Sequence, residues 1–257
     1  MAAETQFGDW NWEDPDRLAV RMDEFTEDVA RCAKLEVVSD AVPRTRQGLA
    51  EIGVTGIEFA AFKTEHPSGL GTDLIGVRCG EDLTEPGKVY QVDGRSLFTQ
   101  LDIGKPLPFE DASVDWVYAE HLIEHVPLLT AISWLTEVRR VLAPGGVLRI
   151  TTPDLRKYVE GYLGDSGFFA KHRRRLRVMR VGPPMPERKA FMFNQIFYLY
   201  GHRWIYDHEE LRHALTEAGF DPAAIHVREY RTGARHDVAE LDTSFRNDET
   251  IYLEVTA

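Results

Sequence analysis

The sequence contains little cysteine and no long hydrophobic segment. Only Cys32 and Cys79 occur among its 257 residues, and no run of 18 apolar residues is present. Two thiols so far apart in the sequence indicate neither a disulfide framework nor a thiolate metal site, which fits a reducing compartment. The lack of a long apolar run argues against a membrane-spanning helix, and the acidic N-terminal stretch lacks the apolar core of a secretory signal. We therefore expect a cytoplasmic protein without a membrane partner.

Positive charge is scarce as well. Lysine and arginine together number 30 against 42 acidic residues, which gives a formal net charge of -12. A surface of this sign repels a phosphate backbone, so we expect no nucleic-acid partner. The exception is Lys171–Arg180, whose sequence KHRRRLRVMR concentrates cations. This stretch either meets an anionic small-molecule acceptor or forms a solvated helix face that balances nearby acids.

The length and the hydrophobic content of 43% suit one domain with additions better than two separate domains. An amphipathic helix is predicted from Asp14 to Cys32, because Asp14-Pro15 has the form of a helix start and apolar residues then recur at steps of three and four. A second, shorter helix is predicted over residues 42–52. Residues 1–53 are therefore expected to form a helical cap on the sheet that follows.

The strongest pattern along the chain is a strand, a helix and a second strand. Val114–Ala119 is apolar enough for a buried strand, a helical face extends from Leu128 to about Leu142, and Val147–Thr151 follows a proline-glycine turn. This order is the right-handed crossover of a parallel sheet, which places ligands at the carboxyl ends of its strands. Weaker signals add strands at residues 57–62, 75–79 and 90–92.

The chain beyond Pro153 changes character. Glycines, the basic stretch and the aromatic segment Phe191–Tyr200 indicate an insertion, and the aromatic segment either covers an acceptor or packs as a core helix. His208–Gly219 then predicts an amphipathic helix that stops at a glycine. Ile225–Tyr230 and Ile251–Val255 predict a terminal pair of strands.

Four motifs occur together in the middle of the chain. They are D-x-x-x-P-L-P-F from Asp102, E-H-x-x-E-H from Glu120, R-V-L-x-P-G-G from Arg140, and Pro153-Asp154. Together they resemble a small branch of the class I S-adenosylmethionine-dependent methyltransferases. The resemblance implies a Rossmann-like α/β fold: a mainly parallel sheet with an antiparallel C-terminal strand, an N-terminal helical cap and an inserted lid. It also implies a methyltransferase-like domain over residues 54–257, with the lid over about 156–205, and S-adenosylmethionine as cofactor.

In that family the cofactor needs a glycine-rich turn, an acid after the second strand and a polar group for the adenine. The turn position here holds Phe59–Lys63, and two glycines follow later. The acid is displaced to Glu81 or Asp82, whereas Asp102 matches its family counterpart near the adenine. Either a rearranged loop still binds the cofactor, or the affinity for it is weakened or lost. The expected cofactor-binding residues are Ala60, Gly69, Gly71, Glu81, Asp102 and Glu120.

The segment Glu120–His125 is the strongest catalytic candidate. His121, Glu124 and His125 stand at spacings that place them on one face of a helix. The triplet spells an inverted zinc-protease signature, but its context, a strand that leads into a short turn of helix, argues against a protease. It resembles the E-x-x-E-H segment of metal-assisted O-methyltransferases, which implies that these three residues bind a divalent metal. Alternatively, the histidines only hydrogen-bond loops.

The remaining catalytic candidates are His202 and Asp154. His121 or His202 is expected to act as general base, and Asp154 either orients an acceptor hydroxyl or caps the next helix. The predicted activity is O-methylation of a small or glycosidic metabolite. Two alternatives stay open: a methyltransferase fold that only binds a ligand or a partner subunit, and a metal-dependent hydrolase that uses His121, Glu124 and His125. A homo-oligomer is left open too.

Overall fold

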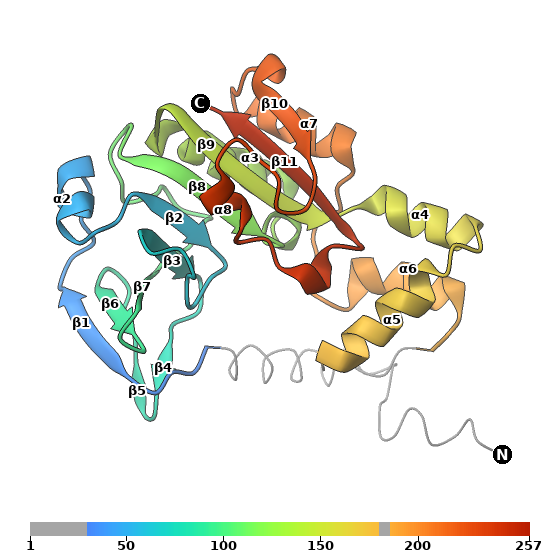
Figure 1. Ribbon diagram of the computed structural model, residues 1–257, viewed down its shortest axis with the longest axis horizontal. Helices are drawn as coiled ribbons and strands as arrows, with labels where there is room; N and C mark the ends of the chain where they lie inside the picture. The colour runs from blue at the N-terminus through green and yellow to red at the C-terminus, as the bar shows by residue number, and fades with distance from the viewer. Residues whose placement is uncertain (1–29, 180–185) are drawn as a thin grey trace.

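The computed structural model describes residues 30–179 and 186–257 (Figure 1). The helix expected from Asp14 to Cys32 lies almost wholly outside these ranges, as does much of the expected cap. Inside them, the second predicted helix is present as α2 (Arg46–Glu51), and the side chain of Thr45 caps it by accepting the Gly48 N–H.

Within the described residues, nine strands form one sheet in the order β1-β6-β7-β3-β2-β8-β9-β11-β10. The five central strands are parallel, whereas β11 runs antiparallel to β9 and β10 antiparallel to β11. The expected α/β class, a mainly parallel sheet with an antiparallel C-terminal strand, is therefore confirmed. The strands are β1 (Leu35–Ser39), β2 (Gly56–Phe59), β3 (Gly69–Asp73), β6 (Val89–Val92), β7 (Ser96–Gln100), β8 (Val114–Glu120), β9 (Leu142–Pro153), β10 (Ile225–Arg228) and β11 (Thr250–Thr256). A separate hairpin pairs β4 (Arg78–Cys79) with β5 (Asp82–Leu83).

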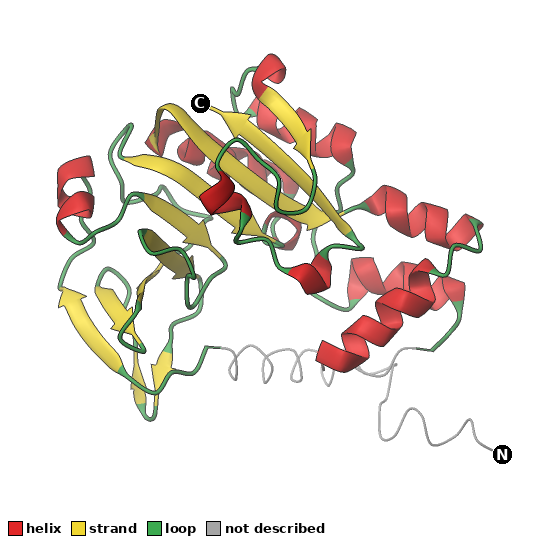
Figure 2. Cartoon of the chain, viewed as in Figure 1, coloured by secondary structure: helices red, strands yellow, loops and turns green. Residues whose placement is uncertain are grey.

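One face of the sheet is covered by helices α3 (Leu128–Val141) and α7 (His208–Glu217), which also contact each other (Figure 2). Trp134 and Leu135 of α3 and Leu211 and Leu215 of α7 are fully buried in the main apolar cluster. Their spacing of three to four residues matches the helical period, which explains why this part of the fold could be predicted. Asp207 starts α7 by accepting the Glu210 N–H, as its position before His208 suggested.

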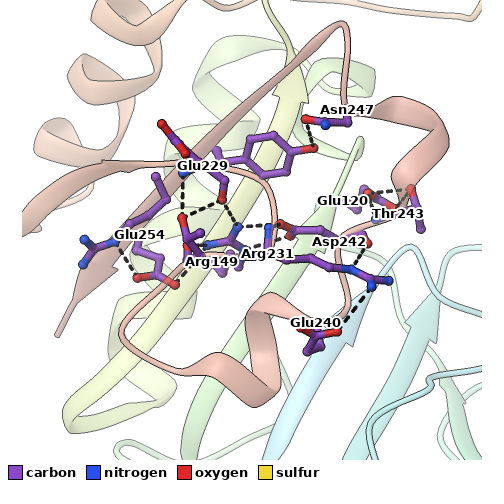
Figure 3. A network of polar contacts seen from close by, with 12 residues as sticks. Glu120, Arg149, Glu229, Arg231, Glu240, Asp242, Thr243, Asn247 and Glu254 are labelled. Atoms are coloured by element: carbon purple, nitrogen blue, oxygen red, sulfur yellow. Dashed lines mark hydrogen bonds and ion pairs between the residues drawn. The ribbon is translucent and has the colours of Figure 1, made fainter.

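The opposite face is covered by the segment that connects β10 to β11, which includes α8 (His236–Ala239) and the single turn η3 (Ser244–Arg246). A buried polar network ties this segment to the sheet (Figure 3). Arg149 of β9 is fully buried and donates to Asp242 of the segment and to Glu254 of β11. Because a buried guanidinium needs acceptors for all its N–H groups, this arginine fixes where the segment lies.

The crossover from β2 to β3 contains no helix. Residues 60–68 instead form a loop that lies directly on β3. A Cβ added to Gly69 would stand 2.7 Å from Thr64 Oγ1, and one added to Gly71 would stand 2.5 Å from the Ala61 carbonyl oxygen. Both glycines are therefore needed by packing, inside a strand. The expected second strand at residues 75–79 is wrong, because the strand beside β2 is Gly69–Asp73.

Three helices occupy most of the predicted lid: α4 (Leu155–Leu163), α5 (Phe168–Met179) and α6 (Lys189–Tyr198). They lie together beyond the end of β9 (Figure 1) and share a second apolar cluster that includes Tyr158, Met192 and Ile196. The aromatic segment thus contributes packing residues, as in the core-helix alternative. In the basic stretch, Arg173 pairs with Glu187 and Arg175 with Asp248, which matches the charge-balancing alternative.

The two cysteines are far apart in the sequence but adjacent in the fold. The Cys32 N–H donates to the Arg78 carbonyl oxygen at 2.8 Å, and burial together with the neighbouring Cys79 thiol raises the pKa of Cys32 to about 11. Both cysteines are free thiols of intermediate exposure. No helix in the part of the chain that the structure describes is long and apolar enough to cross a membrane.

Candidate functional site

The turn expected to hold the cofactor lies at the carboxyl end of β2, where Ala60 is exposed. Ala60 directly follows β2 and has a φ of 56°, a left-handed conformation that favours glycine. The backbone thus keeps a glycine-like turn although the residue is alanine. Glu58, two residues earlier, is half-buried; the withdrawal of its carboxyl from water raises its pKa to about 7, and Oε2 has no hydrogen-bond partner among the described residues.

Asp73 ends β3 and is the acid that the sequence analysis missed. Its Oδ1 accepts the Ile75 N–H at 2.9 Å, and burial raises its pKa to about 6. Glu81 and Asp82, the acids expected to follow the second strand, are exposed on the β4–β5 hairpin. This assignment was wrong because the second strand was placed too late. The available signal in the sequence was the apolar pair Leu74-Ile75 directly after an acid.

A cavity of about 660 Å³ opens beside the ends of β3 and β7. It is lined by apolar side chains, among them Leu74 and Leu101, and by the polar Gln100 and Asp102. The Asp102 carboxylate accepts a hydrogen bond from the Gly104 N–H through Oδ1 at 2.9 Å. Its Oδ2 forms an ion pair with Lys105 Nζ at 3.4 Å. A volume of this size, with apolar walls and a few polar groups, is typical of a site for a small organic ligand. Asp102 therefore lines a ligand-sized cavity, and its expected place near an adenine stays a prediction.

The short helical turn expected after the strand is present, but it begins too late to include His121. Strand β8 extends to Glu120, His121 has a φ of 50°, and only the single 3-10 turn η1 (Ile123–His125) follows. The Glu120 carboxylate is turned toward the β10–β11 segment, where it accepts the N–H and the hydroxyl of Thr243 at 3.0 and 2.8 Å. Burial raises the pKa of Glu120. The left-handed residue breaks the helical register, so the three expected ligands do not share a helix face.

His121 makes contacts that differ from those of a simple metal ligand. Its Nε2 lies 2.8 Å from Thr250 Oγ1, and that hydroxyl donates to the Arg246 carbonyl oxygen, so Nε2 must carry the proton that joins it to Thr250. Nδ1 lies 3.4 Å from Glu124 Oε1. Burial holds the pKa of His121 well below its ordinary value.

Glu124, His125 and His202 form a compact cluster, in which one ligand atom from each lies within 4.8 Å of the others. The ring centroids of His125 and His202 are 4.8 Å apart. Glu124 is fully buried; Oε2 accepts the Thr152 hydroxyl at 3.0 Å, while Oε1 has no hydrogen-bond partner within the described residues. Of the three ligands expected from the sequence, the structure therefore keeps two and brings His202 to them in place of His121.

The two imidazoles of the cluster are held by backbone carbonyls. His202 donates from Nδ1 to the Ile196 carbonyl oxygen at 2.5 Å, and His125 is hydrogen-bonded to the backbone at Tyr200. Each ring therefore keeps one nitrogen with a free lone pair, the arrangement that metal-binding histidines show. Burial lowers the pKa of His125 to about 4 and that of His202 to about 3, and it raises the pKa of Glu124 to about 8.

Asp154 is buried at the start of α4. Its Oδ1 accepts the Arg156 N–H at 2.9 Å, so the residue caps the helix, as in the second of its two predicted roles. Burial raises its pKa. The predicted lid also contains buried or half-buried polar side chains. Tyr158 donates to Glu249 and lies 3.2 Å from His172 Nε2, while the Tyr200 hydroxyl has no partner within the described ranges.

Comparison with known proteins identifies similar chains. The model of the methyltransferase-domain family matches residues 23–225. An uncharacterised 37.1 kDa protein in a transposon of Streptomyces fradiae is 27% identical over 142 residues, which are 54% of this chain and 40% of that protein. The chain therefore matches less than half the length of that relative.

Among solved structures, an S-adenosylmethionine-dependent methyltransferase from Mesorhizobium loti is 16% identical, with a TM-score of 0.43 and coverage of 82% of this chain and 96% of that one. A methyltransferase from Thermotoga maritima, described as a possible histamine N-methyltransferase, is 16% identical, with a TM-score of 0.45 and coverage of 94% and 93%. At this identity the likeness concerns the fold alone.

Proposed function

The chain belongs to the methyltransferase-domain family, and from that premise we propose that it transfers a methyl group from S-adenosylmethionine to a hydroxyl oxygen of a small or glycosidic metabolite. The family and the fold class expected from the four motifs are thereby confirmed. The cofactor, the acceptor atom and the residues in contact with them belong to the proposal.

The observation that carries the proposal is a ligand-sized cavity that is lined by Asp102 and by Leu74, the residue directly after Asp73. Asp73 ends β3, Asp102 follows β7, and the cavity of about 660 Å³ extends from Leu74 to Asp102. These residues fit an adenosyl group. Asp73 would accept the two ribose hydroxyls, Leu74 would cover one face of the adenine, and Asp102 would accept from its amino group. Ala60, at the turn where the methionine part would lie, is exposed.

The chemistry at the acceptor is assigned to the cluster of Glu124, His125 and His202. The cofactor, when bound, supplies the electrophilic methyl group. The lid and the ends of β8 and β9 would hold the acceptor in line with that methyl group and keep water away. His202 donates its Nδ1 proton to the Ile196 carbonyl oxygen. The Nε2 lone pair is therefore free to accept the proton of the acceptor hydroxyl. His121, whose Nε2 proton is engaged with Thr250, would position Glu124, and Asp154 would fix the start of the lid.

A direct test measures methyl transfer and cofactor binding separately. Incubation with methyl-labelled S-adenosylmethionine and a panel of hydroxylated metabolites should give a labelled ether, stable to mild base. Calorimetry should detect binding of S-adenosylmethionine and of S-adenosylhomocysteine. Absence of binding at millimolar nucleoside would contradict the proposal and favour the alternative of a fold that no longer methylates.

The pH dependence of cofactor binding follows from Asp73. Burial raises its pKa to about 6, so its carboxyl is increasingly protonated below that pH and then accepts fewer hydrogen bonds from a ribose. We expect the affinity for S-adenosylhomocysteine to be constant above pH 7 and about tenfold weaker at pH 5, one unit below the pKa. Calorimetry from pH 5 to pH 8 measures this. A flat profile would mean that Asp73 does not contact the nucleoside.

We include a divalent cation in the proposal, held by Glu124, His125 and His202. Its fit rests on the unpartnered Glu124 Oε1 and on two imidazoles whose other nitrogens bond to the backbone. When bound, the cation would polarise the acceptor hydroxyl, and His202 would then serve as a ligand and not as the base. Two nitrogen ligands favour zinc or cobalt over magnesium.

Metal analysis of the purified protein should give close to one equivalent after dialysis against Zn²⁺ or Co²⁺, and the cobalt form should show visible absorption bands. The change His202→Ala is expected to weaken binding by at least about tenfold, since it removes one of three ligands. His226→Ala, on exposed β10, is the matched control and should bind as the unchanged protein does. Equal metal content in both variants would rule this ligand set out.

A further inference from the structure

Arg246 occupies a fixed position beside the acceptor cluster. It ends η3, in the segment between β10 and β11, and threonines on both sides of it are tied to the end of β8. Thr243 donates to Glu120, and Thr250 bonds to His121 while donating to the Arg246 carbonyl oxygen at 2.6 Å. The segment therefore cannot carry Arg246 away from the site without breaking these bonds.

The Arg246 guanidinium acts on the Glu120 and Glu124 carboxylates only from beyond ion-pair distance, where its charge offsets part of the rise in their pKa. Its neighbours on the same side of the fold are paired: Arg228 with Glu254, Arg231 with Glu240 and Arg235 with Asp237. Among the described residues, Arg246 has no ion pair, and its side-chain contact is the Phe245 ring, 5.8 Å from the guanidinium carbon. The nearby Glu120 carboxylate is already engaged by Thr243.

Arg246 is also partly withdrawn from water, since its exposure is intermediate. A half-buried cation gains from an anion brought by a ligand, because water compensates its charge only in part. Arginine is suited to this role, since its planar donor fork matches the two oxygens of a carboxylate or a phosphate. The site is thus prepared for a negatively charged group.

We propose that Arg246 anchors an anionic group of the methyl acceptor, so that the acceptor is a hydroxylated carboxylate or phosphate ester such as a sugar acid or a sugar phosphate. The inference rests on the proposed function. Arg246 serves the acceptor and not the cofactor, because its segment is pinned over β8 and β11, beside Glu124 and His125, whereas Asp73 and Asp102 end β3 and β7 on the other side of β8.

The test compares matched probes on the full-length protein. Glucuronate and glucose 6-phosphate are each compared with glucose, by thermal shift and by label transfer from methyl-labelled S-adenosylmethionine. We expect at least one of the two anions to give the same thermal shift and the same rate of label transfer as glucose at a concentration about tenfold or more lower. The reason is that a charge-assisted pair is worth roughly 1.5–3 kcal/mol. Arg246→Gln should remove this preference, and Arg246→Lys should keep part of it. Arg231→Gln, in the same segment, is the control and should leave the preference for the anions unchanged.

A second measurement separates the acceptor from the cofactor. S-Adenosylhomocysteine carries a carboxylate, whereas 5′-methylthioadenosine lacks the amino-acid group. Arg246→Gln should leave the affinity for both nucleosides unchanged. If it weakens S-adenosylhomocysteine alone, Arg246 binds the cofactor and the proposal is overturned; equal action of the anions and glucose on the unchanged protein overturns it as well. Failure of both nucleosides to bind the unchanged protein contradicts the methyltransferase proposal, whereas the anion preference is read independently by thermal shift.

Discussion

Replacing Asp73 with asparagine is expected to weaken S-adenosylhomocysteine binding by a factor of about 30 to 1,000. The carboxylate at the end of β3 is placed to accept both ribose hydroxyls, and a hydrogen bond to a charged group is worth roughly 1.5–3 kcal/mol. Asparagine keeps one acceptor oxygen, so part of the interaction survives and the loss amounts to about 2–4 kcal/mol. Isothermal calorimetry at pH 7.5 measures it.

The matched control for this prediction is Asp82→Asn. It makes the same chemical change at the acid that the sequence pattern favoured, but Asp82 is exposed on the β4–β5 hairpin. We expect its effect on affinity to stay below about twofold, the range of an ordinary surface substitution. A larger loss for Asp82→Asn than for Asp73→Asn would return the ribose site to the hairpin and would refute the assignment of Asp73.

Replacing Arg149 with methionine is expected to lower the free energy of unfolding by about 3–5 kcal/mol. The change would leave Asp242 buried without its cation and Glu254 with Arg228 alone, and a buried charge that loses its partner costs this much. Arg149 also donates to the carbonyl oxygens of Thr232 and Glu229, which would lose their donors. Equilibrium unfolding in urea, followed by tryptophan fluorescence, measures the loss.

Arg228→Met tests whether burial is the cause. Arg228 contacts the same Glu254 at 2.8 Å, but its side chain is 31% exposed. We expect a loss of about 1 kcal/mol or less, since water can replace the contact. Combining Arg149→Met with Asp242→Leu and Glu254→Leu should restore part of the stability, because the triple variant no longer buries the two carboxylates that Arg149 neutralised. Equal losses for Arg149→Met and Arg228→Met would contradict the special role of the buried arginine.

The parts of the fold that were predicted correctly are those in which local pattern and tertiary role agree. Val114–Ala119 is apolar because it is buried, and α3 shows a regular apolar face because it packs on the sheet. β3 was missed for the opposite reason. Gly69-Leu70-Gly71 is typical of a turn, but its glycines are required because the crossover loop lies on the strand. No local pattern reports that a distant loop will occupy the place of a side chain.

The candidate site was predictable in composition more than in geometry. The residues Glu124, His125 and His202 were recognised as chemistry-bearing, but their convergence depends on the lid, which brings His202 to the end of β8. The left-handed His121 could not be foreseen, since a histidine inside E-H-x-x-E-H shows no sign of breaking a helix. Arg246 gives no sequence signal at all, because an unpaired arginine is defined only by the partners that it lacks.

The position of β11 also governs how this chain can fold during synthesis. β11 follows β10 in the sequence but lies between β9 and β10 in the sheet. While the ribosome is still translating residues 229–249, β10 has no strand to pair with and β9 presents an open edge, which is prone to association with other nascent chains. Only when β11 has left the exit tunnel can it insert between them. The interval before β11 emerges is therefore the stage at which chaperone protection of β9 and β10 matters most.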